Sequence, residues 1–456
     1  MKPIPKRRLI PIITDLAEYK QAANNTINYT KKMVEQYGDV CEVSFTGIKN
    51  YFIHDPDVIK EILTTLGPKM KRTTLFRAFR KFLGHGLFTS DGDYHKRQRR
   101  LIKPAFYPQR IEEYASIMVS CADEEMKNWK EGEMINVNQA MTRITLKVIT
   151  KAMFGSGIDN GVIEDVGKDL RLAFAVMNTI VQNPFYVYCL DKEIHIPIIK
   201  KFFKLKAKLD RVVNGIIALY RKDGAVGRTD LLSMLMEARD EDSGTGMTDE
   251  QVRDEVMTFF LAGHETTTLA LTWSLYMIGK HPEVENKFYE EVRTNIQNRL
   301  PQASDYQMLH CTKNIFKETL RLYPPAWTFA REPMEDVVIQ DYHFPKGCVL
   351  WTITYLLHHD EKYFHNAEKF IPERWDEEKI KELPKYAYFP FGGGNRMCIG
   401  EGFAWMEGIL VLATIASQFR LQLPADFSTE INPVFSLKMK RNVMMKVVSN
   451  VKMKTI

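Results

Sequence analysis

The sequence predicts a mainly helical (α+β) fold with small β-sheets towards both ends of the chain. Most of its 456 residues lie in segments with helical periodicity, and a long apolar segment occupies residues 248–282. Stretches rich in β-branched and aromatic residues are few: residues 40–55, residues 336–354 and a tail at 434–451 that reads as a hairpin. We expect early and late strands to pair, which would make the chain one interwoven domain.

The composition is that of a globular protein, with 45% hydrophobic and 26% charged residues. The length exceeds the usual size of one domain, so length alone favours two domains. A net charge of +6 is too small to indicate a nucleic-acid-binding protein. The N-terminal residues carry charge and proline and show no apolar signal or anchor segment. Six scattered cysteines without a CxxC pair favour a reducing compartment, and we expect a cytoplasmic protein.

The chain contains two clusters of basic residues and one long polar segment. Residues 200–208 are expected to form a solvated helix face. Residues 96–103, KRQRRLIK, could form a similar face or a docking patch for an acidic protein. Residues 240–250, DEDSGTGMTDE, form a loop that either separates two domains or joins two helices of one domain.

The apolar segment reads as one long helix. Thr248 and Gln251 form a capping box at its start, and Pro282 marks its end. The helix is long enough to cross a membrane, but Glu265 near its centre would be costly there. A helix buried in a large protein core is therefore the better prediction.

The centre of this helix, AGHETT, combines a small residue, an acid and an alcohol. Gly263 removes side-chain bulk, so a flat group could lie against the backbone. Glu265 needs a partner or water if it is buried. Thr266 can bond back to the preceding turn. These residues could also form a kinked helix with a surface glutamate, and both interpretations stay open on this segment alone.

Residues 313–325, KNIFKETLRLYPP, form a second helix, which two prolines end. Glu318 and Arg321 share one face of it, and Arg374 of the later sequence FIPERW could complete a Glu–Arg–Arg cluster. A surface ion pair of little energetic value is the alternative. A buried cluster would hold the fold together without taking part in chemistry.

Residues 391–400, FGGGNRMCIG, place Cys398 among glycines directly before a helix. By residue type the cysteine could be a nucleophile, a metal ligand or core filling. A metal ligand must be a thiolate, and the N-terminus of a helix that begins near Gly400 would lower the thiol pKa. The glycine-rich turn would let backbone N–H groups point at the sulfur.

Four motifs occur together in one order: AGHETT, ETLR, PERW and FGGGNRMCIG. In this combination the sequence resembles the cytochrome P-450 family of haem monooxygenases, from about residue 37 to residue 447. The resemblance implies a single catalytic domain over residues 1–456, with no fused reductase and no membrane anchor. It implies haem b as cofactor, with Cys398 as the iron ligand that favours O–O cleavage.

The resemblance also assigns roles to other residues. Glu265 and Thr266 would deliver protons to dioxygen, and Ala262 and Gly263 would line the groove above the cofactor. Phe391 of the cysteine motif would contact the cofactor, and four cations would bind the haem propionates: His95, Arg99, Arg331 and Arg396. His95 stands where the family commonly has tryptophan. The expected substrate pocket is apolar and includes Leu87, Phe88, Phe260, Ala326 and Trp327.

The expected reaction consumes two electrons, dioxygen and a hydrophobic substrate and yields a hydroxylated product and water. A fatty acid is the first expectation for the substrate, followed by a terpenoid or a steroid. No flavin or nicotinamide fingerprint is present, so NAD(P)H electrons would arrive through a ferredoxin or flavodoxin that docks near residues 96–103. The alternatives are a peroxide-driven peroxygenase and a haem protein that senses a ligand; the acid–alcohol pair favours the monooxygenase.

Overall fold

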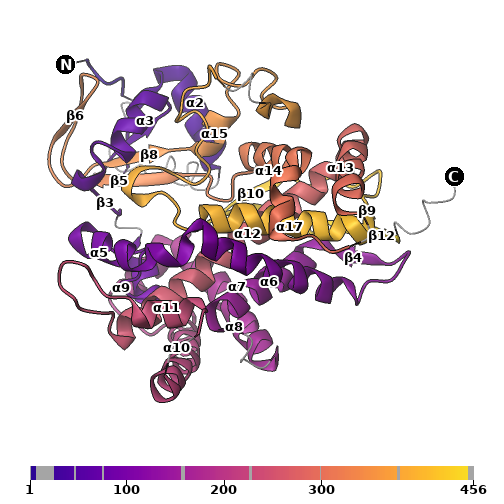
Figure 1. Ribbon diagram of the computed structural model, residues 1–456. Helices are drawn as coiled ribbons and strands as arrows, with labels where there is room; N and C mark the ends of the chain where they lie inside the picture. The colour runs from indigo at the N-terminus through magenta and orange to yellow at the C-terminus, as the bar shows by residue number, and fades with distance from the viewer. Residues whose placement is uncertain are drawn as a thin grey trace. The chain divides into compact units, whose positions relative to one another are not determined.

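The computed structural model describes residues 2–6, 25–45, 48–73, 76–155, 160–224, 228–297, 299–376 and 381–449 (Figure 1). The chain divides into two compact units. Unit 1 contains Met1–Leu75, Lys317–Cys398 and Ile431–Lys438. Unit 2 contains Phe76–Phe316, Ile399–Glu430 and Met439–Ile456. Each unit therefore takes segments from distant parts of the sequence.

Unit 1 is built on a five-stranded sheet. In spatial order its strands are β1 (Val40–Phe45), β2 (Ile48–Ile53), β8 (Val349–Thr352), β5 (Phe329–Pro333) and β3 (Met70–Lys71). β1 and β2 are antiparallel, whereas β2 pairs with β8 in parallel, with Asn50 opposite Val349. The expectation that early and late strands pair is thereby confirmed.

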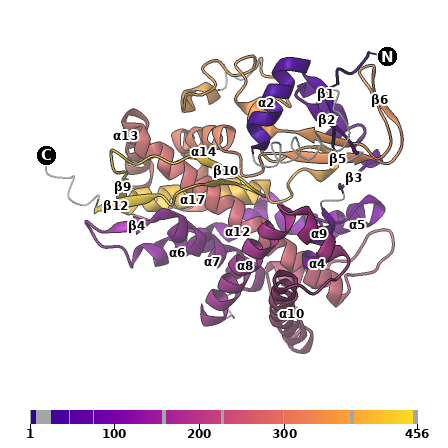
Figure 2. The ribbon, with the colours of Figure 1, turned by 180° about the vertical axis from the view of Figure 1, so that it is seen from behind.

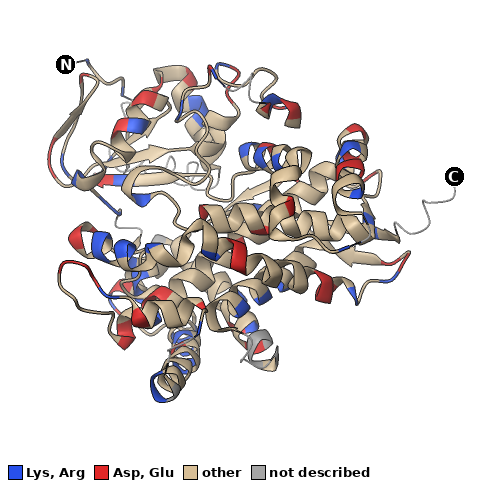
Figure 3. Ribbon diagram, in the orientation of Figure 1, with Lys and Arg blue, Asp and Glu red and all other residues tan. Residues whose placement is uncertain are grey.

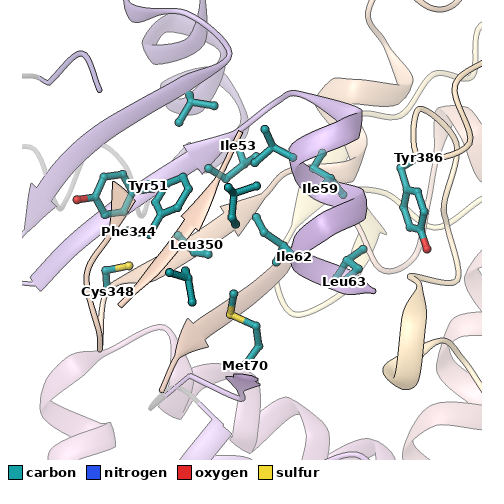
Figure 4. Close-up of a cluster of buried hydrophobic side chains, with 14 of the residues drawn as sticks. Tyr51, Ile53, Ile59, Ile62, Leu63, Met70, Phe344, Cys348, Leu350 and Tyr386 are labelled. Carbon is teal, nitrogen blue, oxygen red and sulfur yellow. The ribbon is translucent and has the colours of Figure 1, made fainter. Parts of the chain in front are cut away.

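Shorter elements complete unit 1. Two small antiparallel pairs are present, β6 (Val337–Ile339) with β7 (Tyr342–Phe344) and β10 (Ile431–Pro433) with β11 (Leu437–Met439). The helices are α2 (Thr26–Tyr37), α3 (Pro56–Leu63) and α15 (Thr354–His358). One face of α3 packs on the sheet, and Figure 4 shows Ile59, Ile62 and Leu63 of this face in a cluster with Ile53 and Leu350.

Unit 2 is mainly helical (Figures 1 and 2). Its helices are α4 (Phe76–Leu83), α5 (Gly92–Ile102), α6 (Pro108–Met126), α7 (Val137–Phe154), α8 (Asn160–Val181), α9 (Pro184–Asp191), α10 (Pro197–Asp223), α11 (Leu231–Glu237), α12 (Asp249–Lys280), α13 (Pro282–Ile296) and α17 (Glu401–Gln418). The last turns of α14 (His310–Leu322) belong to unit 1. α12 packs against α7, α10 and α17, which explains its apolar surface.

The ends of α12 agree with the sequence prediction. The Thr248 hydroxyl accepts a hydrogen bond from Gln251 N at 3.2 Å, and the Gln251 side chain accepts one from Thr248 N at 3.0 Å. The polar loop before α12 joins it to α11 within unit 2 and is not a boundary between the units. No helix of the described residues is long and apolar enough to cross a membrane, and residues 7–24 lie outside them.

The prediction of a hairpin at residues 434–451 is wrong for the residues that the structure describes. The strand β11 pairs with β10, while β12 (Met444–Ser449) pairs with β9 (Phe419–Gln422) and β4 (Met134–Asn136). Each strand of the tail has a partner elsewhere in the sequence. The alternation pattern shows that a strand exists, but it carries no information about which strand lies beside it.

Candidate active site

The cysteine motif is a tight loop closed by backbone hydrogen bonds. The amide of Cys398 donates to the carbonyl of Phe391 at 2.9 Å, and the amide of Met397 donates to Gly394 O at 3.1 Å. Cys398 is exposed at the end of this loop. It lies two residues before Gly400, the N-cap of α17. The predicted arrangement of a cysteine directly before a helix is therefore present.

The glycines of the loop have packing partners in unit 1. Gly394 has a φ of +64°, and a Cβ there would overlap the carbonyl oxygen of Leu63 in α3. A Cβ on Gly393 would lie 2.5 Å from a ring carbon of Tyr386. These two glycines let the loop lie against α3 and Tyr386. This is a role that the sequence reasoning missed, because it considered only a group beside the sulfur.

Cys398 differs from the other cysteines in exposure. Four of them, Cys41, Cys121, Cys189 and Cys348, are buried, and Cys311 is half-buried. Burial raises the pKa of the Cys41, Cys121 and Cys348 thiols to about 12. Burial therefore disfavours the thiolate form of those three cysteines at neutral pH. Cys398 is the cysteine whose surroundings leave it accessible.

Two of the expected propionate partners lie in unit 1. Arg331, in β5, is buried with 5% of its surface exposed, and its Nη1 donates to Ala330 O at 2.9 Å. A surface arginine is thereby excluded at this position. Arg396 lies two residues before the cysteine and is half-buried. Their assignment to a carboxylate-bearing cofactor stays a prediction.

The predicted Glu–Arg–Arg cluster is present and buried. The carboxylate of Glu318 accepts two hydrogen bonds from Arg321, at 2.9 and 2.8 Å, and one from Arg374 Nε at 2.8 Å. It also accepts from Ile371 N at 3.0 Å and Trp375 Nε1 at 2.8 Å. Neither side chain of the Glu318–Arg321 pair is exposed. The alternative of a surface ion pair is wrong.

The centre of α12 is accessible, although the helix around it is buried. Every residue from Val252 to Ile278 is buried except Ala262, which is exposed, and Gly263, Glu265 and Thr266, which are half-buried. The Thr266 hydroxyl donates to Ala262 O at 2.6 Å, the predicted bond to the preceding turn. These side chains therefore form a polar opening on an otherwise covered helix.

Two residues beside this opening pack against other parts of unit 2. A Cβ on Gly263 would lie 3.0 Å from Ile149 Cδ1, so the glycine allows α7 to approach closely. His264 Nδ1 lies 2.6 Å from Phe260 O, and the His264 ring stacks on Phe174 with centroids 5.8 Å apart. The glycine thus has a role in helix packing that differs from the predicted groove, and its contact with a cofactor stays a prediction.

The basic helix α5 carries the other expected propionate partners. His95 is buried and Arg99 is half-buried, and because they are four residues apart they share one face. Figure 3 shows the Lys and Arg residues of α5. Arg97 donates to Thr245 O at 3.1 Å, and Arg100 binds Asp240 at 2.6 Å.

Arg97 and Arg100 therefore hold the loop before α12, so each already has a partner within unit 2. Lys96 and Lys103 are exposed.

The expected pocket residues fall into two groups. Leu87 and Phe88 lie in the loop after α4, where the Phe88 ring contacts Phe76 with centroids 5.2 Å apart. Phe260 and Trp327 are core residues with 1% and 5% exposure. Phe260 packs on Phe154, and the Trp327 indole donates to Val434 O at 2.9 Å. Ala326 is half-buried. A role of these residues in substrate binding stays a prediction.

Buried acids of unit 2 were not predicted. Glu255 of α12 and Glu407 of α17 have 0% and 1% exposure. Burial raises the pKa of Glu255 to about 8 and that of Glu407 well above its ordinary value. The sequence pattern that could have identified them is an acid at a core position of an apolar helix. Such an acid must either be neutral or have a partner.

Residues 3–446 match the family model of cytochrome P450. The chain is 31% identical over 387 residues to cyclooctat-9-en-7-ol 5-monooxygenase of Streptomyces melanosporofaciens, covering 85% of this chain and 83% of that one. It is 30% identical over 400 residues to pentalenene oxygenase of Streptomyces avermitilis, covering 87% of each. The crystal structure of the cytochrome P450DA heme domain superposes with a TM-score of 0.86, at 25% identity and 98% coverage of both chains.

Proposed function

Because the chain belongs to the cytochrome P450 family of haem monooxygenases, we propose that Cys398 holds haem and that the enzyme hydroxylates a terpenoid-like hydrophobic compound. The observation that carries the proposal is the exposure of Cys398 on a loop closed by hydrogen bonds, in a chain whose other thiols are buried or half-buried. An accessible thiol before a helix N-terminus has the environment that a thiolate ligand needs.

The donor set fits haem better than a free metal ion. Within the described residues, no group of three or more His, Cys, Asp or Glu side chains could hold a metal ion. A single cysteine suffices for iron that a porphyrin already binds by four nitrogens. By resemblance to the family, the propionates would be bound by Arg396, Arg331, His95 and Arg99. When bound, haem with a thiolate ligand supplies the activation of dioxygen.

Glu265 and Thr266 would supply protons. The Thr266 hydroxyl donates to Ala262 O, so its oxygen lone pairs can accept a hydrogen bond from a water molecule or from an acid. Glu265, which precedes Thr266 in sequence and is half-buried, is the acid that we assign to this step. The overall reaction takes up two protons and two electrons with dioxygen, and one oxygen atom leaves as water while the other enters the substrate.

The relatives revise the order of candidate substrates. Cyclooctat-9-en-7-ol and pentalenene, which the names of the two relatives contain, are terpenoids. A terpenoid therefore replaces a fatty acid as the first candidate. The apolar character of Leu87, Phe88 and Ala326 is compatible with either class. Electrons would come from NAD(P)H through a separate ferredoxin or flavodoxin.

The test is a titration of the purified haem protein with a sesquiterpene hydrocarbon, a diterpene alcohol and a fatty acid, followed through the spin state of the iron. A saturable shift with a terpenoid and none with the fatty acid supports the proposal. The reduced carbon monoxide complex should show the red-shifted absorbance of a thiolate ligand. Cys398→Ser should abolish that absorbance, whereas Cys311→Ser should keep it. Turnover with peroxide alone, at the rate seen with a reductase, would favour a peroxygenase.

A further inference from the structure

Three consecutive charged residues are buried near the start of α12. Arg253, Asp254 and Glu255 have 6%, 4% and 0% exposure. Neighbouring residues of a helix point about 100° apart, so their burial means that other parts of the chain cover α12 on several sides here. Charged groups are buried at a cost unless they have partners. The partners of these three residues therefore show what the cluster is for.

All three side chains bind backbone groups at the end of α4 and in the loop after it. Arg253 Nη2 donates to Phe82 O at 3.1 Å. The Asp254 carboxylate accepts from His85 N at 2.6 Å. The Glu255 carboxylate accepts from Leu87 N at 2.8 Å, although the two residues are 168 positions apart in sequence. These bonds fix the backbone of the segment that we call the 84–90 loop, residues 84–90.

The 84–90 loop is also shaped to lie directly on α12. A Cβ on Gly84, whose φ is +73°, would overlap the Asp254 carboxylate. A Cβ on Gly86 would overlap the hydroxyl of Thr258 and would lie 2.6 Å from Asp254 O. Side chains at these positions would push the loop off the helix. Hydrogen bonds and close packing thus act together to hold one loop conformation.

Glu255 connects the loop to a third element, α5. Its second carboxylate oxygen accepts from Gln98 Nε2 at 3.1 Å. The amide oxygen of Gln98 accepts from Arg97 Nη1 at 3.3 Å, which is consistent with the amide nitrogen facing Glu255. Gln98 lies between His95 and Arg99. One buried carboxylate therefore joins α12, the 84–90 loop and the helix expected to contact the haem propionates.

We propose that Glu255, assisted by Asp254, is a positioning residue that sets substrate selectivity by fixing the 84–90 loop. The bond to Leu87 N holds the backbone from which the side chains of Leu87 and Phe88 project. Phe88 then packs on Phe76 and Phe79, with centroids 5.2 and 5.9 Å apart. This inference rests on the proposed function, because it takes Leu87 and Phe88 to contact the substrate.

The first test is hydrogen exchange of the haem-loaded protein, read from peptides that cover the 84–90 loop. Glu255→Ala should speed exchange there by about tenfold. Glu255→Gln keeps an oxygen that can accept from Leu87 N and should stay within about threefold of the wild type. Glu250→Ala, which removes an exposed acid of the same helix, should change nothing. Unchanged exchange in Glu255→Ala would overturn the proposal.

The second test compares two ligands of the haem iron by absorbance titration. Imidazole reports on the iron alone, whereas 4-phenylimidazole also fills the space above it. Glu255→Ala should weaken the binding of 4-phenylimidazole by about tenfold and that of imidazole by less than about twofold. Glu255→Gln should restore the wild-type ratio of the two affinities. An unchanged ratio despite faster loop exchange would reduce Glu255 to a structural residue and refute the proposal.

A second variant is needed in case Glu255→Ala does not fold, and the results must distinguish failure of this proposal from failure of the proposed function. If Glu255→Ala does not accumulate as folded protein, Gln98→Met removes one of the two donors to Glu255 and should change exchange and the ligand ratio by about threefold. Failure of both ligands to shift the wild-type spectrum would count against the proposed function. The exchange experiment would still decide whether Glu255 holds the 84–90 loop.

Discussion

Replacing Glu318 by glutamine should destabilise the protein strongly. The substitution keeps the shape of the side chain but removes the negative charge that faces Arg321, and neither side chain is exposed. Arg321 also donates to three carbonyl oxygens, those of His358, Ala367 and Lys369, so it cannot turn towards solvent without losing them. The variant would therefore keep a buried guanidinium without its counter-ion.

The magnitude follows from that burial. Breaking a buried ion pair on one side costs about 3–5 kcal/mol, because the other charge stays desolvated. Four donor groups, from Arg321, Arg374, Ile371 and Trp375, converge on the carboxylate. A glutamine oxygen can accept some of their bonds, while its NH₂ group would face donors. The expected loss in the free energy of unfolding is thus about 3–5 kcal/mol.

The assay is equilibrium unfolding in urea, followed by far-ultraviolet circular dichroism. Glu335→Gln is the matched control, because Glu335 pairs with Lys69 at 2.6 Å in the same unit but is 56% exposed. The control should lose less than about 1 kcal/mol. A loss of under about 1 kcal/mol in Glu318→Gln as well would refute the argument that the buried carboxylate holds this part of unit 1.

Three further predictions concern protons and charge. The folded-state pKa of Glu255, about 8, lies above the ordinary value of 4.5. Between these two pH values the folded state binds more protons than the unfolded state. The free energy of unfolding should therefore fall as pH rises, by up to about 5 kcal/mol. Urea unfolding at several pH values should show this fall in the wild type and a smaller fall in Glu255→Gln. Thr266→Ala should lower product formed per electron pair by about tenfold and release peroxide, and full coupling would exclude a relay through this hydroxyl. Lys96→Glu combined with Lys103→Glu should slow reduction by an acidic donor at low salt. Arg100→Glu should instead lower the free energy of unfolding, because it breaks the bond to buried Asp240. If the double lysine variant and Arg100→Glu changed the reduction rate and the stability equally, the separate roles of the lysines and of Arg100 would be contradicted.

Local patterns allowed the sequence to predict much of this protein. The capping box at Thr248 depends on residues three positions apart, and the Glu318–Arg321 pair on one helical turn, so both could be read directly. The placement of Cys398 before a helix followed from the order of residues in one loop. In each case the partners are close in sequence or belong to a motif of fixed order.

Contacts between distant segments were not predictable in the same way. The pairing of Glu255 with Leu87 N depends on how a loop lies on a helix, and no spacing rule encodes it. Arg100 looked like part of a free basic face because Asp240, its partner, is 140 positions away. Gly394 was interpreted from the cysteine beside it, although its close neighbour is Leu63. These residues show where pattern reasoning needs three-dimensional information.

The parallel pairing of β2 with β8 has a consequence for synthesis of the chain. Asn50 of β2 emerges from the ribosome about 300 residues before Val349, the residue of β8 with which it pairs, has been synthesised. At about 5–20 residues per second, β2 would wait roughly 15–60 s with one edge unpaired. An unpaired strand edge is a template for aggregation. Nascent chains arrested before Val349 should therefore bind chaperones or aggregate through the β1–β2 hairpin, whereas chains arrested after Thr352 should do so less. Equal behaviour of the two would mean that another segment covers the edge during translation.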